Sequence, residues 1–399
     1  MKYTDFLGER VSLLGFGAMR FPTVKVGDKT EVDLPLTEKM IDLAVESGVN
    51  YFDTAYPYHR GESERIIGKL LSKYPRESYH LATKYPGHQL MDSYDPGEIF
   101  EEQLSKCGVD YFDFYLLHNV YENSMDTYLD KRWGIIDYFL EEKRRGRIRH
   151  LGFSSHGTPE NLREFLERTG GAMEFCQIQY NYLDDSLQRA DEKCKILDEY
   201  GIPIIVMEPV RGGKLATLPD PCTEKLSQLR PGASAASFAF RWLFHNPSVK
   251  VVLSGMSNME QLVDNIRTFT EYVQLSAEER ELLGIIAEQL KCSVPCTACR
   301  YCTDGCPAGL DIPSLIEIYN DLACAKSLNT AMRVEFLPDD KKPSACISCG
   351  KCTEICPQRI AIPKVMSKLC NILTTIPSWR DISREREEDA ARMREANKH

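Results

Sequence analysis

The sequence predicts an α/β protein in which a (β/α)8 (TIM) barrel is followed by a small, mainly helical, cysteine-rich domain. Three observations carry this prediction. Short apolar runs alternate with amphipathic stretches of helical length through roughly the first 270 residues, as expected for a barrel of this type. Polar residues stand at the ends of several of these runs. Two identical patterns of four cysteines each lie near the C-terminus.

The bulk composition excludes several classes of protein. The 399 residues are 43% hydrophobic, which is enough for one large core and a small second domain. A net charge of −10 argues against a nucleic-acid-binding protein, which needs a basic face for phosphates. No apolar run approaches the ~20 residues that a bilayer requires, and no secretory leader precedes the first strand. We therefore expect a cytoplasmic protein with reduced cysteines and no membrane partner.

The barrel elements follow one another in regular order. A small hairpin at residues 1–10 is expected to close the bottom of the barrel. The predicted strands are 13–19, 49–55, 80–85, 111–118, 149–154, 175–180, 203–208 and 249–255. The helices predicted between and after them are 37–47, 63–72, 96–107, 137–145, 159–168, 188–200, 234–245 and 259–269. Alternating strands and helices predict a parallel sheet, and we assign residues 1–285 to the barrel domain.

The two cysteine patterns follow C-x2-C-x2-C-x3-C-P without deviation. They contain Cys296, Cys299, Cys302 and Cys306, and then Cys346, Cys349, Cys352 and Cys356. This spacing resembles that of bacterial ferredoxins, which implies two [4Fe–4S] clusters. Structural zinc is the alternative, but the third cysteine and the Cys-Pro ending favour iron and sulfur. A disulfide framework does not suit a long chain of this kind.

The ferredoxin pattern also implies a grouping of the ligands. In two-cluster ferredoxins the fourth cysteine of each run binds the other cluster. One cluster would take Cys296, Cys299, Cys302 and Cys356, and the other would take Cys346, Cys349, Cys352 and Cys306. An uncrossed arrangement stays open.

The cysteine-rich domain is expected at residues 290–375. A helical stretch at 277–291 leads into it, and an amphipathic run at 312–324 separates the two patterns. The long connection favours a helical ferredoxin-like domain. Residues 380–399 form a charged tail, either a solvated helix or a disordered end, to which we assign no function.

Chemistry is predicted at the carboxyl ends of the barrel strands, where catalytic groups of such barrels gather. Asp53 and Tyr58 follow the second strand, Lys84 ends the third and His118 ends the fourth. A tyrosine titrates near ~10 and needs a cation to stabilise its phenolate before it acts as an acid at neutral pH. Lys84 would supply that charge, and Asp53 would keep Lys84 ionised.

Each of these residues also has an ordinary explanation. Asp53 and Lys84 are compatible with a plain buried ion pair, and His118 with a core histidine. Their order at successive strand ends favours catalysis.

The first part of the chain, about residues 1–272, resembles the aldo-keto reductase superfamily. The matching residues are Gly15 to Met19, Asp53 to Tyr58, Gly61 to Glu64, Thr83, Lys84, Leu116 to His118, Gly152 to Ser155, Gln177 to Asn181, Gly255 to Asn258, Gln261 and Asn265. The resemblance implies a barrel that binds a nicotinamide dinucleotide without a Rossmann fold. It also implies direct hydride transfer to a carbonyl.

The resemblance assigns roles residue by residue. Tyr58 resembles the general acid, Lys84 and Asp53 the pair that tunes its pKa, and His118 the residue that orients the carbonyl. The residues implied in cofactor binding are Gly17, Met19, Asp53, Ser154, Ser155, Gln179, Met207, Arg211, Lys214, Gly255, Ser257, Gln261 and Asn265. Among them, Ser154, Ser155 and Gln179 resemble the residues that hold the nicotinamide carboxamide. Arg211 or Lys214 is a candidate contact for the pyrophosphate.

Two departures from the family pattern concern the cofactor. Met207 stands where many members have an aromatic residue that stacks on the nicotinamide. Gly255 and Gln261 replace the Lys and Arg that often clamp the 2′-phosphate, so NADP(H) and NAD(H) both stay open.

The sequence thus predicts an NAD(P)(H)-dependent oxidoreductase that reduces a small aldehyde, ketone or sugar. The clusters would exchange electrons with a redox partner protein or be structural. The alternative is a nicotinamide-sensing electron-transfer module without turnover. A full set of four catalytic residues favours the enzyme. Tyr121, Trp133 and Glu208 are candidates to line the substrate pocket.

Overall fold

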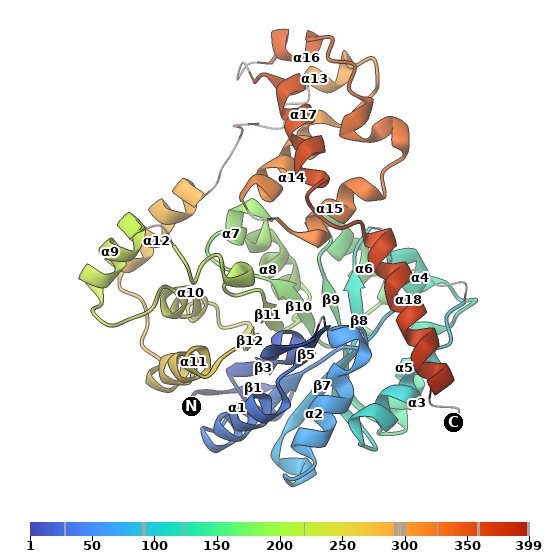
Figure 1. The fold of residues 1–399 in the computed structure, drawn as a ribbon, viewed down its shortest axis with the longest axis vertical. Helices are drawn as coiled ribbons and strands as arrows, with labels where there is room; N and C mark the ends of the chain where they lie inside the picture. Colours follow the sequence, from blue (N-terminus) through green and yellow to red (C-terminus); the bar gives the residue numbers. More distant parts are fainter. Residues whose placement is uncertain are drawn as a thin grey trace. The chain divides into compact units, whose positions relative to one another are not determined.

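The computed structural model divides into two compact units, Met1–Leu283 and Gly284–His399 (Figure 1). It describes residues 1–27, 29–89, 93–122, 124–218, 220–290, 294, 296, 301–324, 326–356 and 360–396. The units are described in turn.

The first unit is a closed barrel of parallel strands. In spatial order the strands are β10 (Cys176–Gln179), β11 (Ile204–Met207), β12 (Val249–Ser254), β3 (Leu14–Gly17), β6 (Tyr51–Asp53), β7 (His80–Tyr85), β8 (Phe112–Val120) and β9 (Ile148–Ser155). Every pairing around the ring is parallel. The predicted barrel is confirmed, and each predicted strand contains or overlaps an observed one.

An N-terminal hairpin closes one end of the barrel. Its strands are β1 (Tyr3–Phe6) and β2 (Glu9–Ser12), paired antiparallel. Phe6 is fully buried and stacks on Phe114 of β8 at 4.7 Å between ring centroids. Val11 belongs to the same interior cluster. The hairpin therefore plugs the end where the strands begin and leaves the other end for chemistry.

Helices surround the barrel. Their bounds are α1 (Leu34–Glu46), α2 (Ser63–Leu71), α3 (Pro96–Cys107), α4 (Met125–Leu129), α5 (Ile135–Arg144), α6 (Pro159–Thr169), α7 (Asp184–Leu187), α8 (Ala190–Glu199), α9 (Asp220–Leu229), α10 (Ala235–Leu243) and α11 (Met259–Glu271). Helix α12 (Ala277–Leu290) crosses the boundary between the two units. Helix α3 has the predicted bounds because Asp95 caps its first turn and Gly108 ends it in a left-handed conformation. The sequence did not predict α4, α7, α9 or the hairpin β4 (Thr23–Val26) and β5 (Lys29–Val32).

The second unit is built from helices. They are α13 (Tyr301–Asp304), α14 (Ile312–Cys324), α15 (Leu328–Glu335), α16 (Lys351–Glu354), α17 (Ile362–Leu373) and α18 (Trp379–Ala396), with short 3-10 turns at Asp339–Lys341 and Pro343–Ala345. Ile316 of α14 and Met366 of α17 lie in its apolar core. The mainly helical domain that the sequence predicts is thus confirmed.

The charged tail, for which the sequence left a helix and a disordered end open, is helical in its described part. Glu335 holds the start of α18, because its carboxylate accepts from the backbone N–H groups of Trp379 and Arg380 at 2.7 and 3.0 Å. Trp379 itself is buried. None of the helices in the described part of the chain is long and apolar enough to cross a bilayer.

Candidate functional site

The barrel strands bring the four predicted catalytic residues together. Lys84 Nζ donates to Asp53 Oδ1 at 2.6 Å and to the Thr54 carbonyl at 2.7 Å. The same nitrogen lies 5.0 Å from the centre of the Tyr58 ring. The His118 ring meets the Tyr58 ring edge to face, with 5.9 Å between centroids. A phenol, an ammonium and an imidazole therefore share one end of the barrel.

Burial and charge act in opposite directions on this cluster. Burial alone lowers the pKa of Lys84, but the charges of Asp53 and Tyr58 and their hydrogen bonds raise it above its ordinary value. Burial raises the pKa of Tyr58, and the Lys84 charge opposes that rise without cancelling it. Lys84 thus lowers the pKa of Tyr58, as predicted, but burial raises that pKa by more. Both side chains are protonated at neutral pH.

A buried polar network contacts the backbone of Lys84. Glu64 Oε1 accepts from Thr83 Oγ1 and from Gln103 Nε2, both at 2.6 Å. The Gln103 amide also donates to the Lys84 carbonyl at 3.1 Å, and Tyr115 donates to Gln103 Oε1 at 2.5 Å. The sequence did not predict this network because its members come from α2, β7, α3 and β8.

The strand ends next to this cluster carry amides and hydroxyls. Ser154 and Ser155 are buried at the end of β9, and Ser154 Oγ accepts from the backbone of Asn119 at 2.8 Å. Gln177 is 2% exposed, and its Oε1 has no hydrogen-bond partner among the described residues. Its Nε2 lies 3.6 Å from the Met207 sulfur. An unsatisfied buried carbonyl of this kind fits the amide N–H of a nicotinamide carboxamide.

Gln179 and Arg211 are joined through a buried carboxylate. Gln179 Nε2 donates to Asp184 Oδ2 at 2.8 Å, and Asn181 Nδ2 donates to the same oxygen at 2.6 Å. Arg211 Nε lies 3.2 Å from Asp184 Oδ1. The Nη1 atom of Arg211 is buried without an acceptor in the part of the chain that the structure describes, which suits an anionic ligand group.

The loop after β12 and the following helix α11 carry further residues implied in cofactor binding. Ser257 N donates to Gln261 Oε1 at 2.8 Å, and Ser257 Oγ donates to the Arg20 carbonyl at 3.0 Å. Asn265 is buried and donates to Ser254 at 2.9 Å. Three further candidates are placed as follows: Gly17 ends β3, the exposed Met19 follows it, and Lys214 lies just beyond Arg211.

Gly255 in this loop lies under the Arg20 side chain. A Cβ on Gly255 would meet Arg20 carbon atoms at 3.1 Å. The Arg20 guanidinium continues to within 3.8 Å of Glu208, at the end of β11. The loops after β3, β11 and β12 therefore meet at this end of the barrel.

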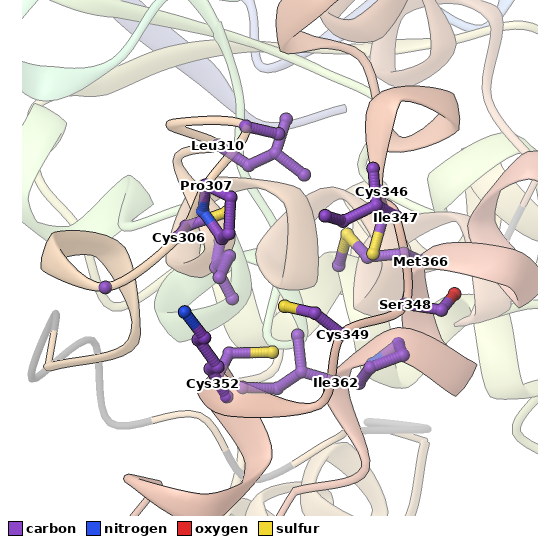
Figure 2. A pocket seen from close by; sticks show the side chains of 15 residues that line it. Cys306, Pro307, Leu310, Cys346, Ile347, Ser348, Cys349, Cys352, Ile362 and Met366 are labelled. Atoms are coloured by element: carbon purple, nitrogen blue, oxygen red, sulfur yellow. The ribbon is translucent and has the colours of Figure 1, made fainter.

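In the second unit, four cysteines line one cavity that is partly open to solvent. They are Cys306, Cys346, Cys349 and Cys352, and Figure 2 shows them around a common space together with Ile362 and Met366. No three His, Cys, Asp or Glu side chains of the described residues are grouped to hold a single metal ion. Cys296, Cys302 and Cys356 are described elsewhere in the unit, and Cys299 lies outside the described residues.

Comparison with known proteins assigns both parts of the chain. Residues 13–288 match the model of the aldo/keto reductase family. The chain belongs to the aldo/keto reductase family. Residues 295–361 match a 4Fe-4S dicluster domain, so this aldo/keto reductase carries an iron–sulfur domain after its barrel.

Curated relatives are similar over most of their own length. An uncharacterized oxidoreductase of Bacillus subtilis is 28% identical over 57% of this chain and 80% of its own. An NADH-specific methylglyoxal reductase of Escherichia coli is 25% identical over 63% of this chain and 88% of its own. An L-galactose dehydrogenase of Arabidopsis thaliana is 25% identical over 70% and 91%.

A solved structure agrees with the fold. The holo form of an aldo-keto reductase from Bacillus halodurans superimposes with a TM-score of 0.58 at 28% identity, covering 72% of this chain and 96% of that one. Together with the family match, this makes the protein an oxidoreductase.

Two polar side chains in this aldo/keto reductase were not assigned from the sequence. Gln177 shares the inward side of β10 with Gln179, and this alternation was the available signal. Asn119 directly follows His118, and no local pattern marked it. Of the candidate pocket residues, Tyr121 is buried, Trp133 packs against Tyr94, and Glu208 stands at the end of β11.

Proposed function

We propose that this enzyme reduces a small aldehyde, ketone or sugar by direct hydride transfer from NADPH or NADH. The observation that carries the proposal is the position of Lys84. Its fully buried ammonium is bonded to Asp53 and lies against the Tyr58 ring, with His118 at the edge of that ring. The names of two relatives, a methylglyoxal reductase and an L-galactose dehydrogenase, also support small oxygenated substrates.

Each residue of the cluster has one task in this reaction. The nicotinamide supplies the hydride when it is bound. Tyr58 donates its phenolic proton to the carbonyl oxygen, and the Lys84 charge stabilises the phenolate that remains. Asp53 holds Lys84 in place and ionised. His118 orients the carbonyl by a hydrogen bond from its ring.

The dinucleotide would lie across the ends of β9 to β12. Ser154 and Ser155 would hold the carboxamide, as the resemblance implies. Gln177, beside Met207, would take the part that the resemblance gives to Gln179, because Gln177 Oε1 is unsatisfied whereas Gln179 donates to Asp184. The unpaired Nη1 of Arg211, with Lys214, would meet the pyrophosphate. Gly17, Met19, Gly255, Ser257, Gln261 and Asn265 would border the ribose and adenine.

We further propose two [4Fe–4S] clusters with crossed ligation. The cavity supports one half of this grouping, because Cys306 of the first run lines it together with Cys346, Cys349 and Cys352 of the second. The other cluster would take Cys296, Cys299, Cys302 and Cys356. The clusters would pass electrons to or from a redox partner protein, or hold the domain together.

Steady-state assays with a panel of carbonyl compounds and either NADPH or NADH test the barrel chemistry. We expect turnover by the wild type and a loss of kcat by about 100-fold or more in Tyr58→Phe. Tyr56→Phe is the matched control, because Tyr56 instead donates to Glu102 at 3.0 Å. Turnover that survives in Tyr58→Phe would refute the mechanism. No turnover of any carbonyl would favour the nicotinamide-sensing alternative.

Metal analysis of anaerobically purified protein tests the clusters. We expect about eight irons and about eight acid-labile sulfides per chain. Electron paramagnetic resonance with NADPH, NADH or dithionite as reductant then shows whether the clusters exchange electrons with the barrel. A cluster signal on adding a nicotinamide supports electron exchange with the barrel, whereas a signal from dithionite alone supports a structural domain or an external partner. Zinc in place of iron would overturn the assignment.

A further inference from the structure

Asn119 has a special backbone position beside the catalytic histidine. The pairing of β8 with β9 shifts register between Leu117 and Val120, and Asn119 inside this irregularity has φ +56°. Such irregularities redirect side chains near active sites, and asparagine tolerates the left-handed region better than most residues. The backbone is fixed on both sides, by the bond to Ser154 Oγ at 2.8 Å and by Ser124 Oγ at 2.7 Å.

The Asn119 side chain is buried but incompletely satisfied. It is 7% exposed, and its Oδ1 has no hydrogen-bond partner among the described residues. Leaving such an acceptor unpaired is unfavourable, so the position favours a ligand that donates a hydrogen bond.

The neighbours of His118, the residue directly before Asn119, hold this histidine in place. The Tyr58 ring lies against one edge of the histidine, and the buried His88 ring packs against it at 4.4 Å between centroids. Tyr128 donates to the His118 carbonyl at 2.5 Å and to the Tyr85 carbonyl at 3.2 Å, which ties the His118 and His88 segments together. The histidine next to Asn119 is therefore held firmly.

We propose that Asn119 is a specificity-determining residue that accepts a hydrogen bond from a hydroxyl on the carbon next to the substrate carbonyl. The unpaired Oδ1 accepts and does not donate, so it favours α-hydroxy aldehydes and α-hydroxy ketones over the same carbonyl compounds without the hydroxyl. The inference rests on the proposed carbonyl reduction, in which Tyr58 and His118 bind the carbonyl oxygen.

Matched substrate pairs test this proposal. We expect the wild type to have a kcat/KM at least about tenfold higher for hydroxyacetone than for acetone, and for lactaldehyde than for propanal, which is the factor that an ordinary hydrogen bond supplies. Asn119→Gly keeps the left-handed backbone but removes the acceptor, and should bring both ratios to about one. Asn119→Asp keeps an acceptor and tolerates the same backbone, and should preserve the preference.

Other outcomes overturn the proposal. A wild-type ratio near one, or an unchanged ratio in Asn119→Gly, shows that Asn119 does not read the hydroxyl. An equal loss for both members of a pair shows that Asn119 acts only by positioning His118. If the wild type reduces simple carbonyls but shows no preference, the inference fails and the proposed function stands. If it reduces neither class, both fail.

Discussion

The two functional regions of this enzyme are assembled in different ways. In the barrel, Lys84 is bonded to Asp53 Oδ1 and to the Thr54 carbonyl at 2.6 and 2.7 Å, and each of these groups lies on or beside a strand. In the second unit, Cys306, Cys346, Cys349 and Cys352 surround a cavity and come from loops and from the four-residue helix α16. The ion pair of the first region forms within the chain alone, whereas the second region needs a group that the chain binds.

The difference is energetic as well as geometric. The barrel residues are held by parallel pairing and by the Glu64 network, which do not depend on a ligand. The described cysteines of the two runs are half-buried or exposed, apart from Cys302. Binding of an inorganic group to such a site supplies folding free energy. Loss of the bound group should therefore lower the stability of the second unit more than that of the first.

The largest effect is expected from breaking the ion pair in the barrel. Lys84→Met removes the charge beside Tyr58, so kcat should fall by about 100- to 10,000-fold. It also leaves Asp53 buried without its partner, which should lower the free energy of unfolding by about 3–5 kcal/mol. Steady-state kinetics and thermal unfolding measure the two effects. Lys69→Met, at an exposed position of α2, is the control. An active and stable Lys84→Met protein would contradict this account.

Removal of iron should destabilise the second unit and leave the barrel unchanged. After anaerobic chelation, we expect amide hydrogen exchange to speed up in α13 and α16 while β7 keeps its protection. Cys349→Ser should give the same pattern, because Cys349 lines the cavity. Cys370→Ser, which changes a cysteine of α17 outside the two runs, should not. Equal loss of protection in the barrel would show that the units unfold together.

A smaller effect is expected at the buried carboxylate that joins Gln179 to Arg211. Asp184→Asn removes the charge facing Arg211 and one acceptor, so the dissociation constant for the nicotinamide dinucleotide should rise by about tenfold. Titration of reduced coenzyme fluorescence measures it. Asp185→Asn, at the next position, is the matched control. If both variants bind alike, Asp184 has no part in holding the coenzyme.

The smallest effect concerns acid stability at a barrel position away from the catalytic cluster. Burial raises the pKa of Glu174, but hydrogen bonds from His150, Lys143 and the Leu151 backbone outweigh it and lower the pKa to about 2. A depressed folded-state pKa stabilises the protein above the ordinary value of 4.5, and this contribution is lost as the pH falls through 2. Urea unfolding should show Glu174→Gln less stable than the wild type at pH 6 and nearly equal to it at pH 2. A difference independent of pH would exclude this charge effect.

The sequence predicted the barrel well because its signals are local. Helix α3 matches its predicted bounds, with Asp95 and Gly108 marking its two ends. The end of β8 was misplaced, since the strand was expected to stop at His118 and continues to Val120. That extension depends on pairing with β9 across an irregularity, which no local pattern in β8 reveals.

The candidate site likewise has a part that the sequence predicted and a part that it did not. The residue types at the strand ends predicted the meeting of Asp53, Tyr58, Lys84 and His118, since parallel strands of a barrel end on one face. The joining of Asp184 to Arg211 was not predicted, because Asp184 begins α7 after β10 whereas Arg211 begins a 3-10 turn after β11. The ligand grouping of the cysteines stays a prediction, although Cys306 lines the cavity of the second run.

The N-terminal hairpin provides an attachment point for electrochemical measurements of electron transfer. Its backbone is tied to the barrel by a bond from Lys2 N to the Phe269 carbonyl at 3.0 Å, and Phe6 fills the end where the strands begin. Met1 therefore lies at the opposite end of the barrel from Tyr58. A linker attached at Met1 would anchor the enzyme to an electrode and leave the catalytic mouth open, so that voltammetry could follow turnover on an oriented film.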